Sequence, residues 1–320
     1  KVLLLEAGKK DRHPFIQIPL AMPLVSNSPK FLWDIATEPE AACNDRVFTP
    51  PRGKVLGGTS SVNAMIYARG HPKDFDQWQR SGLTGWGYKD VLPYFKRSES
   101  NWRGETEFHG GAGPLGISQA GVVNPMHDML CEAAHKLDLP VTEDFNGAQP
   151  EGLAIPDMTI KRGRRSSTSR TFLSQARKRT NLHVLTEARA HKVIVEENIA
   201  IGVQYERGGQ IQIAQANSEV ILAGGTYNSP QLLLLSGIGP AEELVELGID
   251  LVADRTEVGS NLQEHANAFL DFDLSQPISL NNDLRLDRLS MSAIRWQLFG
   301  TGPLADFPIS SAGFFWVHEH

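Results

Sequence analysis

The sequence predicts an α/β fold in which a second, α+β domain is inserted into the first. Short apolar runs that look like buried strands occur at the start of the chain, residues 2–5, and about two thirds of the way along it, residues 219–223. Helix start signals follow the second run, and the strands expected between the two ends look antiparallel. The length of 320 residues favours two domains, because a single hydrophobic core stops growing at roughly 250 to 300 residues.

The first element is the apolar strand at 2–5, which ends in Glu6-Ala7-Gly8. Ligands of doubly wound folds bind at the carboxyl ends of such strands. An acid that ends the second strand of a dinucleotide-binding unit contacts ribose hydroxyls, about 20 residues after a glycine-rich turn. That turn would precede Lys1, and we expect a chain that lacks sequence at both ends. Glu6 is therefore either a ribose ligand or a solvated strand-end carboxylate.

The middle of the chain alternates loops and short helices. Seven prolines between residues 11 and 52 predict an extended surface excursion, because proline disrupts regular helix. Apolar residues at helical spacing predict helices at 89–98 and 126–137, and the glycine-rich stretch 101–121 is expected to be loop.

The last third carries the clearest local signals. Strands are expected at 182–195 and 199–205, joined at 196–198, and a buried strand at 219–223. Ser229 should cap a helix whose first position is Pro230, and Pro240 should open a second helix that Gly248 ends.

Composition excludes several classes of function. The net charge of −6, without a basic stripe, argues against nucleic acid as a partner. Cys43 and Cys131 lie far apart, so the sequence suggests neither a disulfide framework nor a metal site. No apolar run approaches the ~20 residues of a membrane span, and we expect a cytoplasmic protein, with peripheral association with an inner membrane as the alternative.

Two glycine-rich stretches compete as phosphate-binding loops. The literal G-x-G-x-x-G at 111–116 is rejected, because no strand precedes it, no helix follows, and Pro114 occupies the turn. The stretch at 53–70 reads GKVLGGTSSVNAMIYARG. Adjacent glycines let a backbone approach a bulky ligand, and the small hydroxylated residues leave amides free to face phosphate or a flavin edge.

This stretch resembles the first signature of the glucose-methanol-choline (GMC) oxidoreductase family, and residues 225–239, GTYNSPQLLLLSGIG, resemble its second. Shorter matches are LEAG at 5–8, GRRSS at 163–167 and GSNLQEH at 259–265. The resemblance spans nearly the whole chain and is greatest to bacterial alcohol and choline dehydrogenases. It implies an FAD/NAD(P)-binding, Rossmann-like domain at 1–70 and 183–265. It also implies an intertwined α+β substrate domain with an antiparallel sheet, at 71–182 and 266–320.

The resemblance also implies a set of FAD contacts. Carried over by position, Glu6 binds the adenosine ribose, Gly57 and Thr59 lie on the pyrophosphate and flavin, and Ala190 meets the adenine. The isoalloxazine ring is lined by four consecutive residues, Asn63, Ala64, Met65 and Ile66. Some relatives attach FAD through a His one position before the Asn, but this chain has Val62 there, so FAD is expected to be noncovalent.

The resemblance provides no catalytic residue within the chain. His109 and His265 are the tempting general bases, yet neither matches the family's base, which is expected beyond His320. His265 is expected to make a structural hydrogen bond near the cofactor domain, and His109 to be a loop residue.

The implied function is oxidation of a primary alcohol, aliphatic or choline-like, to the aldehyde by hydride transfer to flavin N5. The partners are then the alcohol and an electron acceptor, either oxygen or a quinone-type molecule. Two alternatives stay open: an FAD-containing hydroxynitrile lyase of the same family, and an inactive, truncated flavin fold.

Overall fold

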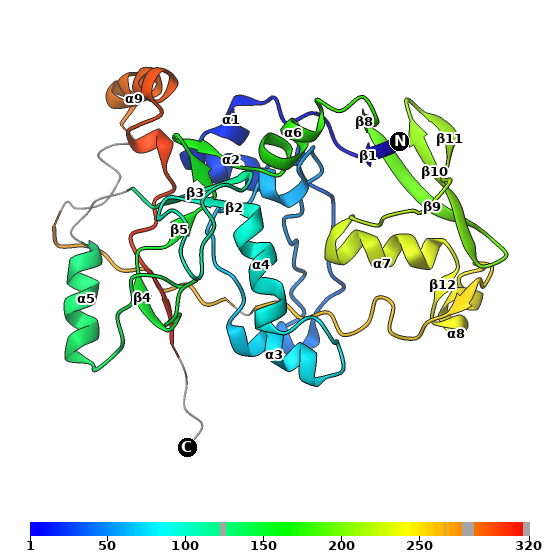
Figure 1. Ribbon diagram of the computed structural model, residues 1–320, viewed down its shortest axis with the longest axis horizontal. Coiled ribbons are helices and arrows are strands. Elements are labelled where there is room, and N and C mark those ends of the chain that lie inside the picture. Colours follow the sequence, from blue (N-terminus) through cyan, green and yellow to red (C-terminus); the bar gives the residue numbers. More distant parts are fainter. Residues whose placement is uncertain (122–125, 266, 277–284, 316–320) are drawn as a thin grey trace. The chain divides into compact units, whose positions relative to one another are not determined.

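The computed structural model describes residues 1–121, 126–265, 267–276 and 285–315 (Figure 1). The chain forms two compact units: unit 1 is Lys1–Lys10 with Thr180–Phe272, and unit 2 is Asp11–Arg179 with Asp273–His320. Residues 11–70, expected in the cofactor domain, belong to unit 2. The predicted domains are defined by expected cofactor contacts, whereas these units are defined by compactness, so the predicted domains stay a prediction. Their boundary at residue 266 lies outside the described residues.

The described part of unit 1 holds three sheets, of which two are longer. Strand β1 (Val2–Glu6) pairs in parallel with β8 (Leu182–Thr186), as expected of an α/β fold. It is not buried as predicted, because Val2 and Leu3 are 54% and 41% exposed. The other longer sheet is an antiparallel meander of β9 (Ala188–Glu196), β10 (Ile199–Arg207) and β11 (Gln210–Gln215). The single strand expected at 182–195 is therefore two strands in two sheets, because Glu187, at φ 56°, breaks the run.

The helices of unit 1 cover this framework. Helix α7 (Gly225–Leu235) packs against β9, as Figure 1 shows, and α8 (Ala241–Glu246) buries Leu244 completely. Two short strands form a parallel pair: β12 (Ile238–Gly239) comes between the two helices in the sequence, and β13 (Ala253–Asp254) follows α8. Helix α8 confirms the helix predicted from Pro240 to Gly248.

Two further predictions in unit 1 are wrong. Helix α7 begins at Gly225 rather than at Ser229, so Pro230 lies inside it and removes one intrahelical hydrogen bond. Residues 219–223 form no strand, and Ile221 is 75% exposed. A strand requires a neighbour that completes its hydrogen-bond ladder, and none pairs with this segment among the described residues.

Unit 2 opens with three short helical segments rather than an extended excursion. These are α1 (Pro14–Gln17), the 3₁₀ segment η1 (Pro19–Ala21) and α2 (Met22–Ser26). Each carries its proline in the first turn, where the missing N–H has no helical partner to lose. Ile16 and Val25 are fully buried in a core cluster with Val55 and Val62, so the expected surface segment is part of the core.

A helical hairpin follows, formed by α3 (Pro72–Arg80) and α4 (Tyr88–Ser98), which confirms the helix expected at 89–98. His71 and Asp74 form a capping box at the start of α3. The rings of Phe75 and Phe95, 5.6 Å apart, join the two helices.

Small sheets fill the rest of unit 2. Strand β3 (Leu115–Gln119) lies between β2 (Glu99–Asn101) and β5 (Asp157–Met158), antiparallel to β5, so the stretch expected to be loop at 101–121 holds a strand. Its adjacent Gly116 and Ile117 are both buried, and the surrounding glycines hide this short strand in the sequence. The remaining strands pair antiparallel: β4 (Gly152–Ala154) with β14 (Ala312–Phe314), and β6 (Ile160–Lys161) with β7 (Arg164–Arg165).

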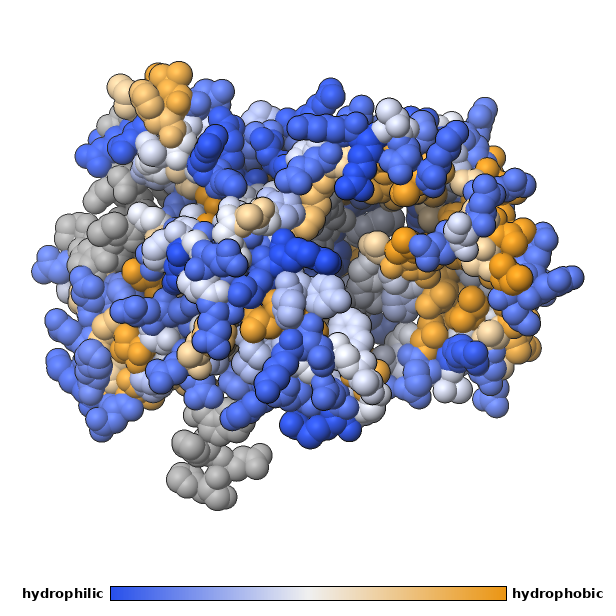
Figure 2. All heavy atoms as spheres, viewed as in Figure 1, coloured by the Kyte–Doolittle hydropathy of each residue, from blue (hydrophilic) through white to orange (hydrophobic). Residues whose placement is uncertain are grey.

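Helix α5 (Met126–Lys136) confirms the helix predicted at 126–137, and α6 (Ser174–Ala176) follows a π-helical turn, η4 (Ser169–Leu173). Helix α9 (Leu286–Phe299) buries Trp296, whose Nε1 donates to the Gly163 carbonyl at 2.6 Å. Figure 2 shows apolar side chains gathered on α9, where Met291, Ile294 and Leu298 are exposed. In the part of the chain that the structure describes, no helix is long and apolar enough to cross a membrane.

Candidate functional site

The glycine-rich loop at 53–61 is held in a shape that requires glycine. Gly57 and Gly58 have φ of 94° and 55°, in the left-handed region, and they lead into the 3₁₀ turn η3 (Gly58–Ser61). A Cβ on Gly53 would collide with the Gly58 carbonyl, so the loop closes on itself here. Thr59 Oγ1 accepts from the Gly53 amide at 3.1 Å, and buried Ser61 donates to the Leu56 carbonyl at 2.9 Å. The loop is therefore rigid before any ligand binds.

The outer side of this loop is open. Within the described ranges, no atom beyond Gly58 and its two chain neighbours lies within 4 Å of the position that a Gly58 Cβ would take, and Thr59 is exposed. A Cβ on Gly57, by contrast, would lie 2.5 Å from Ser61 Oγ. Gly57 is thus required by the loop itself, whereas Gly58 leaves free backbone on the surface.

The four residues expected to line the flavin ring differ in orientation. Asn63 and Ile66 are exposed and Ala64 is half-buried, so they are available to a ligand. Met65 is 1% exposed and packs with Ala120, Met158 and Ile160. Its backbone has φ 65°, which is strained for a residue other than glycine. Its amide donates to Asn63 and its carbonyl accepts from Thr159, so both the side chain and the main chain of Met65 are buried. Val62 is equally buried, in the cluster around Ile16.

Arg165, on β7, holds this segment in place through its guanidinium group. Its Nη1 donates to the Asn63 carbonyl at 2.7 Å and to Asn63 Oδ1 at 2.9 Å, and its Nε donates to the Ile16 carbonyl at 2.9 Å. Asn63 Oδ1 also accepts from the Met65 amide at 3.2 Å. The Asn63 side chain is thereby held by its oxygen, which leaves Nδ2 of this exposed residue as the available hydrogen-bond donor.

The segment continues into backbone contacts with 157–159. Thr159 donates to the Met65 carbonyl from both its amide, at 2.7 Å, and its hydroxyl, at 3.1 Å. The Tyr67 amide donates to the Asp157 carbonyl at 2.7 Å. The expected flavin-lining residues are therefore held at both ends by unit 2.

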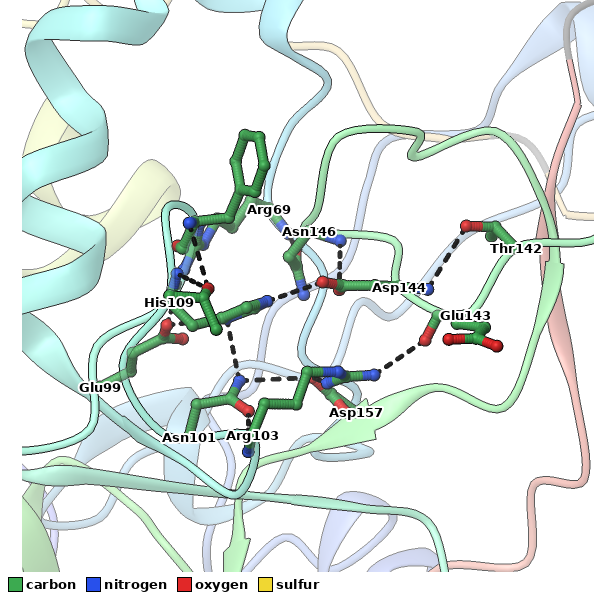
Figure 3. A network of polar contacts seen from close by, with 12 residues as sticks. Arg69, Glu99, Asn101, Arg103, His109, Thr142, Glu143, Asp144, Asn146 and Asp157 are labelled. Carbon is green, nitrogen blue, oxygen red and sulfur yellow. Dashed lines mark hydrogen bonds and ion pairs between the residues drawn. The ribbon is translucent and has the colours of Figure 1, made fainter.

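A network of buried charges lies at the far end of this segment (Figure 3). Arg69 donates to Glu99 Oε1 at 2.9 Å, and His109 lies between two carboxylates, with Nδ1 2.9 Å from Glu99 and Nε2 2.8 Å from Asp144. Figure 3 shows the His109 ring directed at Asp144, with Glu99 on its other side. The side chains of Glu99 and His109 are 0% and 1% exposed.

A second set of contacts joins the same network. Asp157 accepts from Arg103 Nη1 at 2.6 Å and from Trp102 Nε1 at 2.9 Å. Asn146 donates from Nδ2 to the Tyr67 carbonyl at 3.1 Å, and its Oδ1 accepts from the Arg69 amide at 2.8 Å. The network thus fixes the chain on both sides of Ala68.

The network keeps His109 charged. Burial alone would lower the pKa of His109, but its hydrogen bonds to Asp144 and Glu99 outweigh burial and raise the pKa to about 9. Burial would likewise raise the pKa of Glu99, but the hydrogen bonds from His109 and the Gly110 amide hold that pKa below its usual range. Since both ring nitrogens of His109 are taken by carboxylates, the ring is available neither as a base nor as a metal ligand. The sequence correctly placed His109 in a loop but gave no sign of its burial.

The other expected contacts lie in unit 1. Glu6 ends β1 and accepts from the Gly8 amide at 2.7 Å, a turn that fixes its carboxylate at the carboxyl end of the strand. Ala190 is half-buried on β9, opposite Tyr205 in the sheet register. His265 is exposed, so the structural hydrogen bond expected of it stays a prediction.

The second signature stretch, 225–239, forms α7 and all of β12. Ser236 joins it to the meander: its Oγ accepts from the Val193 amide at 2.8 Å and donates to the Leu232 carbonyl. Gly237, at φ 80°, has no room for a side chain, because a Cβ would collide with the Asp250 carbonyl. The second signature therefore has a packing role in this unit.

The residues of unit 2 fit an FAD-type ligand. The preformed loop exposes backbone at Gly58, Asn63 presents an available N–H₂ donor, and Ile66 presents an exposed apolar surface. Sequence reasoning missed Arg165, although the GRRSS stretch that contains it was noted, because nothing in the sequence shows which of its two arginines is buried.

Comparison with known proteins gives one family. A family model described as GMC oxidoreductase matches residues 35–267. A protein named oxygen-dependent choline dehydrogenase from Brucella suis is 43% identical over 313 residues, which is 98% of this chain and 57% of that protein. Its counterpart from Photobacterium profundum is 44% identical over 93% of this chain and 53% of its own length. The chain spans about half the length of these curated relatives.

Several solved structures have a fold similar to that of this chain. A formate oxidase of Aspergillus oryzae matches with a TM-score of 0.88 and 27% identity, over 99% of this chain and 57% of the other. A pyridoxine 4-oxidase from Mesorbium loti matches with a TM-score of 0.76 and 34% identity, over 80% of this chain and 51% of the other. The predicted α/β fold class with antiparallel sheets is confirmed.

Proposed function

Because the chain belongs to the GMC oxidoreductase family, we propose that it forms the FAD-binding part of an oxidoreductase acting on a primary alcohol, choline-like or aliphatic. The product would be the aldehyde. The observation that carries the proposal is the rigid loop at 53–61 with its open face at Gly58, continued by the clamped Asn63. Both belong to a stretch that the family model covers.

Each residue has a proposed role. Glu6 would bind the adenosine ribose and Ala190 would meet the adenine, while the Gly57 backbone and Thr59 would contact the pyrophosphate and flavin. Asn63, Ala64, Met65 and Ile66 would position the ring. The Val62 side chain is buried and chemically inert, which supports noncovalent binding.

Bound FAD would supply the hydride acceptor at its N5 atom. The protein would position that atom through Asn63, and would exclude water from one side with Ile66. His109 is bonded at both ring nitrogens and His265 is exposed on unit 1, so neither is proposed as the base. We propose that the catalytic His lies beyond residue 320, and that the electrons pass to oxygen or to a quinone-type acceptor. A cytoplasmic location is part of the same proposal.

The first test is the absorption spectrum of the purified chain between about 350 and 500 nm, with and without added FAD. Bound flavin should give two bands in this range, and denaturation should release it, because no covalent bond is proposed. Thr59→Trp, which places a large ring on the open face of the loop, should abolish the bands, whereas Thr84→Trp on an exposed loop of unit 2 should not. A folded chain that stays colourless with excess FAD contradicts the proposal.

The second test addresses the reaction and uses a longer chain that includes the C-terminal part present in the relatives. Anaerobic choline or a simple primary alcohol should bleach the flavin bands, and admitted oxygen should restore them if oxygen is the acceptor. A hydroxynitrile lyase would keep its bands under alcohol and release cyanide from a cyanohydrin. That outcome would replace alcohol oxidation as the proposed function.

A further inference from the structure

Arg165 is a buried cation without a buried anion. The whole residue is 1% exposed, and among the described residues no carboxylate forms an ion pair with it. Its partners are carbonyl oxygens and the Asn63 side chain, and its Nη2 atom is buried with no hydrogen-bond partner. Desolvation lowers the pKa of Arg165 to about 10, so the guanidinium stays charged at neutral pH.

Such an arrangement is costly to fold. An unpaired buried charge is among the most destabilising groups in a protein, and an apolar residue of similar size is often neutral or better at such a position. Purely structural clamping of three carbonyl oxygens does not require a full positive charge. A group that uses the charge would explain its presence.

The contacts of Arg165 converge on the segment expected to face the flavin. Its Nη1 donates to the carbonyl oxygens of Ser60, at 3.3 Å, and Asn63, at 2.7 Å, as well as to Asn63 Oδ1. A guanidinium has only donors, so it forces Asn63 to offer its oxygen inward. The outward group of exposed Asn63 must then be the N–H₂ donor.

We propose that Arg165 is a positioning residue for the bound flavin, which acts through Asn63 and through its own charge. It fixes Asn63 with the amide N–H₂ group facing the ring, and it places a positive charge beneath the ring-lining segment. This inference rests on the proposed function, since it takes FAD as the ligand of that segment. A buried positive charge near a ring that gains negative charge on reduction raises the reduction potential of that ring.

Arg164 provides a matched control on the same strand. It is half-buried, its guanidinium lies 4.2 Å from the Trp296 ring centre, and it bonds to Gln17 and Gln297 rather than to the loop. An effect that comes from losing any positive charge should appear when either arginine is substituted. An effect that comes from the contacts with Asn63 should appear only when Arg165 is substituted.

The first experiment uses the chain without FAD and measures hydrogen exchange of the backbone amides at 63–66 by mass spectrometry. In Arg165→Gln the Asn63 side chain loses its anchor, and exchange at Met65 should quicken by about tenfold or more, as expected for a lost hydrogen bond to a charged group. Arg164→Gln should exchange like the unmodified chain. Equal exchange in Arg165→Gln and the unmodified chain would overturn the proposal.

The second experiment uses the FAD-loaded chain and measures the midpoint potential by equilibration with a reference dye, together with the FAD dissociation constant. Arg165→Gln should lower the potential and weaken FAD binding by about tenfold or more. Arg165→Lys should keep most of the potential, because the charge is retained, but should lose the amide protection, because the planar fork is lost. If Arg164→Gln lowered the potential and weakened FAD binding as much as Arg165→Gln does, the proposal would be overturned.

Asn63→Asp keeps the test decisive if Arg165→Gln does not fold. The carboxylate pairs with Arg165, so thermal stability and amide protection should be preserved, while the outward donor and the uncompensated charge disappear. The flavin potential should then fall, and an unchanged potential would overturn the proposal. If the unmodified chain binds no FAD, the proposed function fails. The exchange experiment still decides whether Arg165 holds residues 63–66 in place.

Discussion

At the scale of single residues, unit 2 concentrates charge where water is absent. Glu99 accepts from both Arg69 and His109 and is completely buried. Breaking a buried ion pair by removing one partner leaves the others uncompensated, and it destabilises more than the pair itself contributes.

Glu99→Gln should therefore lower the free energy of unfolding by about 3–5 kcal/mol, because Arg69 and His109 lose their shared carboxylate. Urea unfolding followed by circular dichroism measures the change. The control is Glu206→Gln, which removes the partly exposed contact with His191 at 3.2 Å and should change stability by less than about 1 kcal/mol. Equal effects of the two substitutions would show that the network is no more than a surface contact.

The same network predicts how stability depends on pH. The pKa of His109 is raised from 6.5 to about 9, so the folded state holds this proton more tightly than the unfolded state. The stabilisation is fully present below pH 6.5 and should be lost as the pH rises through 9. The lowered pKa of Glu99 and of Asp144 acts in the opposite direction and removes stability in acid.

Melting temperatures between pH 6 and 10 test this dependence, with His109→Gln as the comparison. The difference in melting temperature between the two proteins should be largest at the acid end of this range and should shrink across pH 9. A difference that stays constant with pH would mean that His109 carries no charge in the folded protein.

Prediction from sequence succeeds least at this scale. The signature residues Gly57, Thr59 and Asn63 could be marked from their pattern, but the partners of a buried charge are not local in sequence. Arg165 contacts Ile16 and Asn63, more than 100 residues away, and His109 meets Asp144 across 35 residues. No spacing rule connects such positions, so His109 resembled any other loop histidine.

At the scale of elements, the two adjacent glycines of the loop differ in what they tolerate. Gly57→Ala adds a Cβ at φ 94° that would lie 2.5 Å from Ser61 Oγ, and it should cost about 2–3 kcal/mol of stability. Gly58→Ala meets open space at φ 55° and should cost about 1 kcal/mol.

Thermal unfolding of both variants without FAD tests the contrast. FAD titration then gives a second measurement. Gly58→Ala should still bind FAD, because it leaves the loop shape intact, whereas Gly57→Ala should bind FAD more weakly. If Gly58→Ala destabilises the chain more than Gly57→Ala does, the loop has a different conformation from the one described.

Elements with periodic patterns were the predictable ones. Helices α4, α5 and α8 match their apolar spacing and start signals, and β10 follows its β-branched run. The errors have tertiary causes: β3 is hidden by glycine-rich neighbours, and residues 219–223 have the composition of a strand but no partner. Pairing, not propensity, decides whether such a segment is a strand.

At the scale of the whole molecule, each unit has buried apolar residues of its own. Leu244 and Val193 are buried in unit 1, and the clusters around Val55 and Met158 lie in unit 2. Family, fold class and cofactor could be predicted from two long motifs, whereas the division into compact units could not, because segments 1–10 and 180–272 join only in three dimensions.

Calorimetry of the chain without FAD should therefore resolve two unfolding transitions. Leu244→Ala should lower only one of them, by about 2–5 kcal/mol, and Glu99→Gln only the other. A single transition that both substitutions shift equally would show that the units unfold as one cooperative body.

The pairing of β1 with β8 has a consequence for biosynthesis. Val2 lies opposite Leu182, so β1 waits while about 180 further residues are made, roughly 10–35 s at ribosomal rates of ~5–20 residues per second. Most of unit 2 emerges in that interval, and unit 2 in turn needs β14 to complete its pair with β4. The nascent chain thus carries an apolar, unpaired strand through much of translation, and a chaperone that binds short apolar segments near residues 2–5 would protect it.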